Sequence, residues 1–239
     1  MKKDIKDQYE CSQVPYNGPI FLEITNEYGM LDTQLEEMLR KRLQGALPGN
    51  LAHEKMRAQI IHEYAARKPF QLSPKEGAVL ILLYPDEHAS DWKFPLIQRP
   101  PYDGVHGGQI SFPGGKKEHT DRDLLQTALR ETYEEIGVSD SSIKIIGKLS
   151  KLDVAASNHV VLPVIGFMDQ KPIFTPHPYE VAEIIEISLI DLFKKNVIKE
   201  KHLQTRGVTL RAPYYDVDDH FIWGATAMIL NELVTLIKS

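Results

Sequence analysis

The chain has 239 residues, of which 42% are hydrophobic, 26% are charged and one is a cysteine. This length and composition are sufficient for a soluble globular domain with a buried core. The formal net charge of −5 provides no general attraction for nucleic acid or for an acidic membrane, so neither is an expected partner. The lone Cys11 excludes an intrachain disulfide. A polar N-terminal segment and short apolar runs predict a cytoplasmic location.

The N-terminal part of the chain predicts an arm followed by a helical extension. Residues 1–29 are irregular and are interrupted by proline and glycine. Apolar residues recur at helical spacing over residues 32–44, and a second helical stretch covers about residues 53–67. Prolines follow that stretch, and the main domain is expected to begin near residue 73. We therefore expect two parts, an extension over residues 1–72 and a catalytic domain over residues 73–239.

Strand and helix patterns alternate along the rest of the chain, which indicates an α/β fold. An amphipathic pattern predicts a long helix over residues 121–136. The last segment begins as a strand at Phe221 and continues as a helix from about Ala225. Apolar or alternating runs predict strands over residues 77–84, 93–98, 109–112, 143–149, 160–168 and 181–187.

The stretch from Phe112 to Val138 combines a glycine-rich turn with a helix that carries three acids near its end. Glu131, Glu134 and Glu135 share one helix face. Like charges at this spacing repel by about 0.2–0.5 kcal/mol per pair, and acids near a helix C-terminus oppose its dipole. A bound divalent cation would reverse this penalty, and an all-oxygen cluster suits Mg²⁺ or Mn²⁺. The alternative is an ordinary solvated helix face.

This stretch resembles the Nudix box, a motif of glycine, acid, an Arg-Glu pair, a Glu-Glu pair and a closing glycine. There are three departures: Asp121 replaces glutamate, Thr132 replaces an apolar residue, and eight rather than seven residues separate Asp121 from Arg130. The resemblance implies a structural role for Asp121, paired with Arg130. It also implies a Nudix-type α/β/α sandwich with a mixed β-sheet. The matching residues are Gly115, Asp121, Arg130, Glu131, Glu134, Glu135, Gly137 and Val138.

The expanded box and its Phe-Pro-Gly-Gly lead-in resemble the coenzyme A pyrophosphatase branch of this family. Two residues upstream depart from that branch, because Pro100 stands where serine is usual and Gly104 stands where a basic residue is usual. The resemblance implies that a divalent cation, Mg²⁺ or Mn²⁺, is bound by Glu131, Glu134 and Glu135 and by the backbone carbonyl of Gly115.

The general base has several candidates in the sequence. One is a glutamate of the box, either Glu134 or Glu131. Another is Glu180, in the loop Pro-His-Pro-Tyr-Glu, which could extend over the site before the following strand. The alternative for Glu180 is a solvated residue at the start of a strand.

Four residues upstream of the box are candidates for substrate binding. Arg99, at a strand end, could contact a phosphate through two hydrogen bonds, or it could form a surface salt bridge. His106 lies in a glycine-rich segment and either binds phosphate or is simply exposed. Gln109 and Ser111 alternate with apolar residues, so they either line the pocket or only satisfy the sheet.

Three functional hypotheses follow. The first is hydrolysis of the pyrophosphate bond of coenzyme A or acyl-CoA, giving 3′,5′-ADP and 4′-phosphopantetheine. The second is hydrolysis of ADP-ribose, NADH or another nucleoside diphosphate derivative. The third, a non-catalytic nucleotide sensor of Nudix fold, is disfavoured because a binder need not keep a destabilising acid cluster. The expected partner is a small-molecule nucleotide, and a homodimer formed through the N-terminal helices is a further hypothesis.

Overall fold

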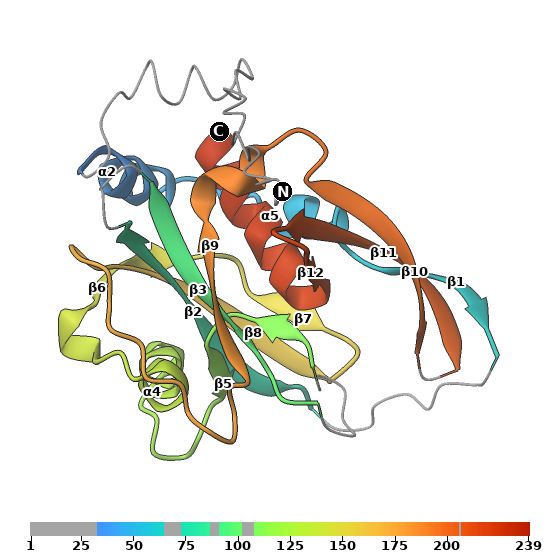
Figure 1. Cartoon of the computed structure of the whole chain (residues 1–239), viewed down its shortest axis with the longest axis horizontal. Helices are drawn as coiled ribbons and strands as arrows, with labels where there is room; N and C mark the ends of the chain where they lie inside the picture. Colours follow the sequence, from blue (N-terminus) through green and yellow to red (C-terminus); the bar gives the residue numbers. More distant parts are fainter. Residues whose placement is uncertain (1–32, 65–72, 87–90, 102–107, 206) are drawn as a thin grey trace, which may run out of the picture.

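The computed structural model describes residues 33–64, 73–86, 91–101, 108–205 and 207–239. In these residues a mixed β-sheet lies between helix α4 on one face and helix α5 on the other (Figure 1). The helices are α2 (Thr33–Arg42), α3 (Gly49–Glu54), α4 (Leu124–Ile136) and α5 (Gly224–Lys238), with 3₁₀ turns η1 (Asp140–Ser142) and η2 (Leu189–Phe193). None of these helices is long and apolar enough to cross a membrane. The expected α/β/α sandwich is confirmed.

The larger sheet has the strand order β4-β3-β2-β8-β6, with β5 beside β2, β7 beside β8 and β9 beside β3. Strands β2 and β8 run parallel, and the other pairs in this sheet are antiparallel. The bounds are β2 (Lys75–Pro85), β3 (Trp92–Gln98), β4 (Ile110–Ser111), β5 (Gly114–Lys116), β6 (Lys144–Lys148), β7 (Leu152–Val154), β8 (His159–Phe167) and β9 (Glu183–Ser188).

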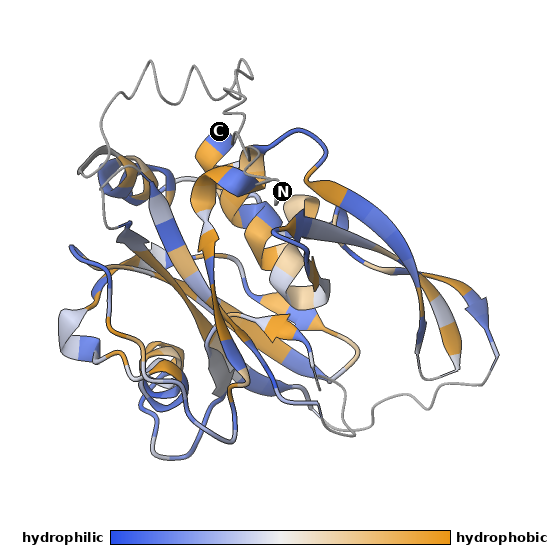
Figure 2. Cartoon of the chain, viewed as in Figure 1, coloured by the Kyte–Doolittle hydropathy of each residue, from blue (hydrophilic) through white to orange (hydrophobic). Residues whose placement is uncertain are grey.

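The central strand β2 supplies apolar side chains to both faces of this sheet. Ile81 and Leu83 belong to the core cluster that includes α5, whereas Leu80 and Leu82 belong to the cluster that includes α4. This alternation is the period of a β-strand, and apolar residues on both faces are expected where a strand is covered on both sides. Figure 2 shows the hydrophobic colouring of this strand and of the adjacent face of α5. The two clusters fix α4, which carries the acids, against the sheet.

A smaller antiparallel sheet has the order β1-β11-β10, with β12 also paired to β11. Strands β10 and β11 extend away from the body as a ribbon beside β1 (Figure 1). Strand β1 of this sheet comes from the expected N-terminal extension. Helix α3, which belongs to the same extension, packs against α5. The bounds are β1 (Gln59–Glu63), β10 (Ile198–Thr205), β11 (Val208–Val217) and β12 (His220–Trp223). The division of the chain at residues 72 and 73 stays a prediction.

The expected second helix, residues 53–67, is wrong over most of the described part. Helix α3 ends at Glu54, and β1 follows it. Within β1, Gln59 pairs with Arg211, which lies 152 residues later. Such a partner is invisible to local periodicity, although two adjacent isoleucines in β1 favour a strand. The helices and strands expected elsewhere are present, with ends shifted by a few residues. Predictions for residues 1–29, for Cys11 and for His106 lie outside the described residues.

Candidate active site

The glycine pair Gly114–Gly115 begins strand β5, where the sequence predicted a turn, and it brings backbone and carboxylate groups together. Strand β5 pairs with β2, placing Gly114 opposite Val79 and Gly115 opposite Ala78. Gly114 has a φ of +150°, and a Cβ added there would lie 2.3 Å from the carbonyl oxygen of Ala78. A Cβ on Gly115 would lie 2.4 Å from the carboxylate of Glu131. Only glycine fits this close approach, so the start of β5 lies directly against the acids of α4.

Glu135 is the most deeply buried acid of the predicted cluster. Its side chain is 1% exposed, and each of its oxygens has a hydrogen bond. Oε1 accepts from Nη2 of Arg99 at 2.9 Å, and Oε2 accepts from the backbone N–H of Gly114 at 2.8 Å. Burial raises the pKa of the Glu135 carboxyl to about 7, although Arg99 and the Gly114 N–H oppose the shift. A cation at this site would favour the charged form.

Arg130 connects the other acids of the box. Its Nη2 is 3.0 Å from Oε1 of Glu131, and its Nη1 is 2.8 Å from Oε2 of Glu134. Glu134 is 49% exposed, whereas Glu131 is mostly buried. Burial raises the pKa of Glu131, and Arg130 acts against this shift. One guanidinium therefore screens the two carboxylates from each other.

Arg130 also pairs with Asp121, as the family resemblance implies. Its Nε and Nη2 each donate to one oxygen of Asp121 at 3.0 Å. The N–H of Glu118 and the hydroxyl of Thr127 complete the partners of this buried carboxylate. The Arg130 hydrogen bonds hold the pKa of Asp121 well below its usual range. The extra residue in the box therefore leaves this structural pair intact.

The donor set fits a hard divalent cation, because it consists of carboxylates beside the backbone of the Gly114–Gly115 pair. Glu131 and Glu135 lie against these glycines, and burial disfavours their charges unless a cation is near. However, no group of three or more acidic, histidine or cysteine side chains in the described residues is already arranged as a metal-binding cluster. The three glutamates instead have arginine partners. Cation binding would therefore require these carboxylates to exchange or share their arginine contacts.

The loop between β8 and β9 places Glu180 close to α4. The backbone N–H of His177 donates to the carbonyl of Glu135 at 2.9 Å, and that of Thr175 donates to the carbonyl of Ile136. Glu180 is 52% exposed, and its charge contributes to the raised pKa of Glu135. This proximity keeps Glu180 a candidate base. The contact of His177 with the helix end, like that of the Gly114 N–H with Glu135, was missed from the sequence. Backbone donors leave no signal beyond the glycine pair.

Of the predicted substrate residues, Arg99 and Ser111 lie on the α4 side of the larger sheet, and His106 is outside the described residues. Ser111 pairs with Ile97, whose side chain belongs to the α4 core cluster, so Ser111 faces that same side. The Ser111 hydroxyl is buried and has no hydrogen-bond partner in the described part of the chain. Gln109 directly precedes β4, and its carbonyl accepts from the N–H of Arg99.

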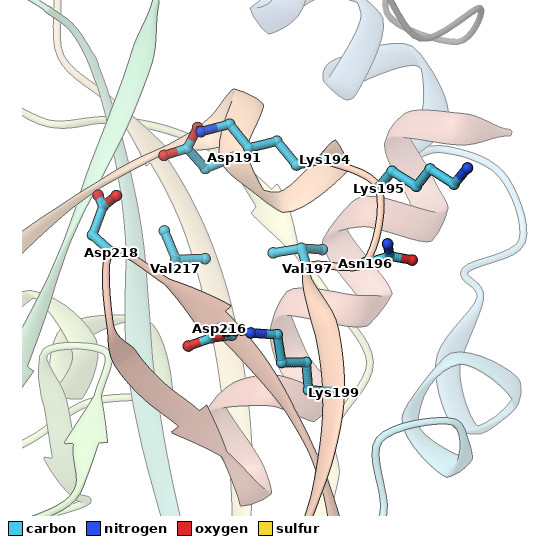
Figure 3. A pocket seen from close by; sticks show the side chains of 9 residues that line it. All are labelled: Asp191, Lys194, Lys195, Asn196, Val197, Lys199, Asp216, Val217 and Asp218. Atoms are coloured by element: carbon cyan, nitrogen blue, oxygen red, sulfur yellow. Dashed lines mark hydrogen bonds and ion pairs between the residues drawn. The ribbon is translucent and has the colours of Figure 1, made fainter. Parts of the chain in front are cut away.

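A cavity of about 160 Å³ lies elsewhere, at the start of β10 and the end of β11 (Figure 3). Lysine and aspartate side chains in its wall pair with each other: Lys194 with Asp191 at 2.6 Å, and Lys199 with Asp216. Its lining includes no residue of α4 or β5. The cavity is therefore separate from the box, and its paired charges give no reason to assign a ligand.

Comparisons with known proteins agree with this geometry. The model of the NUDIX domain family matches residues 74–205. The chain is 30% identical over 133 residues to a protein called uncharacterized Nudix hydrolase NudL from Photorhabdus laumondii, covering 56% of this chain and 71% of the relative. A NudL from Pectobacterium atrosepticum is 33% identical over 133 residues, covering 56% and 69%.

A solved structure supports the fold. RenU, a Nudix hydrolase from M. smegmatis, aligns with a TM-score of 0.50 and 15% identity, covering 75% of this chain and 93% of RenU. The family match covers more than half of the chain, including β5 and the acid-bearing helix α4. The chain therefore belongs to the Nudix family and is a hydrolase of nucleoside diphosphate derivatives.

Proposed function

We propose that this enzyme hydrolyses the pyrophosphate bond of coenzyme A or acyl-CoA, releasing 3′,5′-ADP and 4′-phosphopantetheine. The main observation in support of a hydrolytic site is the position of Glu131 and Glu135 against the Gly114–Gly115 pair of β5. The choice of coenzyme A is supported by the expanded box and its Phe-Pro-Gly-Gly lead-in. The Asp121–Arg130 pair supports the alignment of the expanded box, because it forms despite the extra residue.

We assign cation binding to Glu131, Glu134, Glu135 and the carbonyl of Gly115. Nudix hydrolases generally need a divalent metal such as Mg²⁺ or Mn²⁺. When bound, such a cation neutralises the pyrophosphate oxygens and lowers the pKa of the attacking water. The protein contributes carboxylates that are partly withdrawn from solvent, where electrostatic interactions are strengthened. Arg130 orients two of them through hydrogen bonds of 2.8 and 3.0 Å.

In the proposed reaction, water attacks one phosphorus and the bridging P–O bond breaks. A carboxylate accepts the proton from the water as the new O–P bond forms. We propose Glu180 as this base, with Glu134 and Glu131 as the competing candidates. Glu180 is supported by its exposure and by its electrostatic effect on Glu135. It also needs no release from an arginine, whereas Glu131 and Glu134 both contact Arg130.

We propose that Ser111 and Gln109 contact the substrate, with His106 nearby in the sequence. The Ser111 hydroxyl supports this role, because it is buried with no partner among the described residues, and an unsatisfied buried polar group costs about 1–3 kcal/mol unless a ligand or water pairs with it. A homodimer formed through the N-terminal helices and a cytoplasmic location also remain proposals. Sedimentation velocity and cell fractionation would test these two.

The deciding experiment supplies the full chain with Mg²⁺ or Mn²⁺ and a panel of substrates. The panel contains coenzyme A, acetyl-CoA, ADP-ribose, NADH and dinucleoside polyphosphates, and products are resolved chromatographically. We expect 3′,5′-ADP from coenzyme A, with its formation reduced at least about 100-fold in Glu134→Gln and Glu135→Gln. Glu37→Gln, an exposed change on α2, is the matched control and should retain full activity.

Other outcomes would refute the proposal at different levels. Faster cleavage of ADP-ribose or NADH than of coenzyme A would replace the substrate but keep the chemistry. A protein that cuts nothing on the panel, while a nucleotide still raises its melting temperature, would be a sensor. Activity that survives in both glutamine variants would remove the carboxylates from the mechanism.

A further inference from the structure

Arg99 joins three elements around the most buried carboxylate of the site. It follows the last residue of β3, and its Nη2 donates both to Oε1 of Glu135 at 2.9 Å and to the carbonyl of Gly114 at 3.0 Å. The N–H of Gly114 in turn donates to Oε2 of Glu135 at 2.8 Å. The three groups form a closed ring of hydrogen bonds. The ring links the end of β3, the start of β5 and helix α4.

The backbone of Arg99 is held in place, so its side chain starts from a fixed position. Its N–H donates to the carbonyl of Gln109 at 3.1 Å. The preceding residue, Gln98, lies between β4 and the start of β9: it is opposite Ile110, and its carbonyl accepts from the N–H of Ala182 at 2.8 Å. A guanidinium whose backbone is fixed in this way loses less freedom on holding a carboxylate than one on a free loop would.

Glu135 depends on this anchor more than the other acids depend on theirs. Its carboxylate is 1% exposed, while the Arg99 side chain is 25% exposed. Water therefore cannot readily replace the guanidinium at the carboxylate, and without Arg99 the Gly114 N–H would be its remaining hydrogen-bond donor among the described residues. Glu131 and Glu134 instead share Arg130, which Asp121 holds from the other side. Arg99 thus does for Glu135 what Arg130 does for the other two.

We propose that Arg99 is a positioning residue that fixes Glu135 against the Gly114–Gly115 pair of β5 for cation binding, and not a ligand of the substrate phosphate. The inference rests on the proposed function of the acid cluster. The ring holds the Glu135 carboxylate against Gly114. The carbonyl of the next residue, Gly115, is the proposed backbone ligand. Partners that orient metal ligands commonly contribute 10- to 100-fold to metal affinity.

Two other roles for Arg99 predict different measurements. If its main effect were electrostatic repulsion of the cation, removing the guanidinium would tighten metal binding. If it anchored a substrate phosphate, removing it would raise KM and leave metal binding unchanged. A positioning role predicts weaker metal binding in the absence of substrate, and a KM that changes little once Mn²⁺ saturates the enzyme.

The test measures Mn²⁺ binding to the substrate-free full chain by the electron paramagnetic resonance signal of free Mn²⁺. In Arg99→Met we expect the Kd to rise by about 10- to 100-fold, and in Arg99→Lys by a smaller factor because one cationic donor is retained. Arg122→Met is the matched control. Arg122 lies in the same motif, its side chain is exposed, and its guanidinium donates to Gln126, so the Kd of Arg122→Met should equal that of the wild type.

The results separate this inference from the proposed function. A wild-type chain that neither binds Mn²⁺ nor cuts any substrate would overturn both. Normal wild-type binding, with an unchanged or lower Kd in Arg99→Met, would overturn the role of Arg99 alone. If circular dichroism shows that Arg99→Met does not fold, Arg99→Lys carries the test. Weaker Mn²⁺ binding in Arg99→Lys would then support the inference, and wild-type affinity would overturn it.

Discussion

Replacing Asp121 with asparagine would test how the expanded box holds its arginine. The wild-type carboxylate is 1% exposed and accepts two hydrogen bonds from Arg130, one from the N–H of Glu118 and one from the hydroxyl of Thr127. Asparagine keeps the shape, but it removes the charge and directs an NH₂ group toward donors. Breaking a buried ion pair costs about 3–5 kcal/mol, and Arg130 is 19% exposed, so we expect about 3 kcal/mol.

This loss would be measured as the free energy of unfolding in urea and as the melting temperature. For a chain of this length, about 3 kcal/mol corresponds to a decrease of roughly 6–12 °C. The matched control is Asp123→Asn, two residues away. The side chain of Asp123 caps α4 by accepting from the N–H of Gln126, and asparagine caps a helix about as well. If Asp121→Asn were as stable as Asp123→Asn, the ion pair would not hold the box.

The pH dependence of the same variant gives a second check. Arg130 lowers the folded-state pKa of Asp121, so the carboxylate stabilises the fold fully above its unfolded pKa of about 3.9. This contribution is lost as the pH falls through the lower folded-state value. The stability difference between wild type and Asp121→Asn should therefore be constant above about pH 5 and shrink below about pH 4. A constant difference across that range would contradict the assignment.

Two further predictions concern other contacts. Gly115→Ala places a Cβ 2.4 Å from the movable carboxylate of Glu131, so we expect at least a tenfold loss of kcat with a melting temperature close to wild type. Glu232→Ala removes the acceptor of the Gly49 and Ser150 N–H groups and of His53, and should destabilise the fold by at least about 3 kcal/mol in urea unfolding. Activity per folded molecule should be retained in Glu232→Ala. Loss of kcat there, or full activity in Gly115→Ala, would contradict these assignments.

Local patterns in the sequence predicted the elements whose partners are near them or whose period is strong. The acid-bearing helix is an example: its apolar residues recur at helical spacing, and its Asp123 cap and Gly137 end lie within the same motif. The smaller sheet could not be predicted in this way. Strand β10 is polar and mostly exposed, and β1 exists only beside β11. Such strands depend on distant pairing and leave little apolar periodicity.

The candidate site shows a similar limit. The sequence identified its acids and its glycine pair, although these glycines form a strand and not the expected turn, and the family resemblance implied the Asp121–Arg130 pair. It also placed Arg99 at a strand end, but nothing in the spacing shows that its guanidinium reaches a carboxylate 36 residues later. Alternation along the strand separated Ser111 from Ile110 and Phe112, whereas the absence of a partner for its hydroxyl among the described residues depends on the tertiary fold. Sequence patterns thus identify the chemical groups, and the tertiary fold decides which of them meet.

The arginine contacts also change the energetic argument for a cation. Repulsion between acids at helical spacing costs about 0.2–0.5 kcal/mol per pair, whereas a hydrogen bond to a charged group contributes about 1.5–3 kcal/mol. The contact of Arg130 with the mostly buried Glu131 therefore outweighs the repulsion that the sequence alone suggests, whereas its contact with the exposed Glu134 contributes about as much as the repulsion costs. The burial of the Glu135 carboxylate, which is 1% exposed beside Arg99 and the N–H of Gly114, is the stronger reason to expect a cation. Cation affinity then depends on carboxylates that Arg99 and Arg130 hold in position.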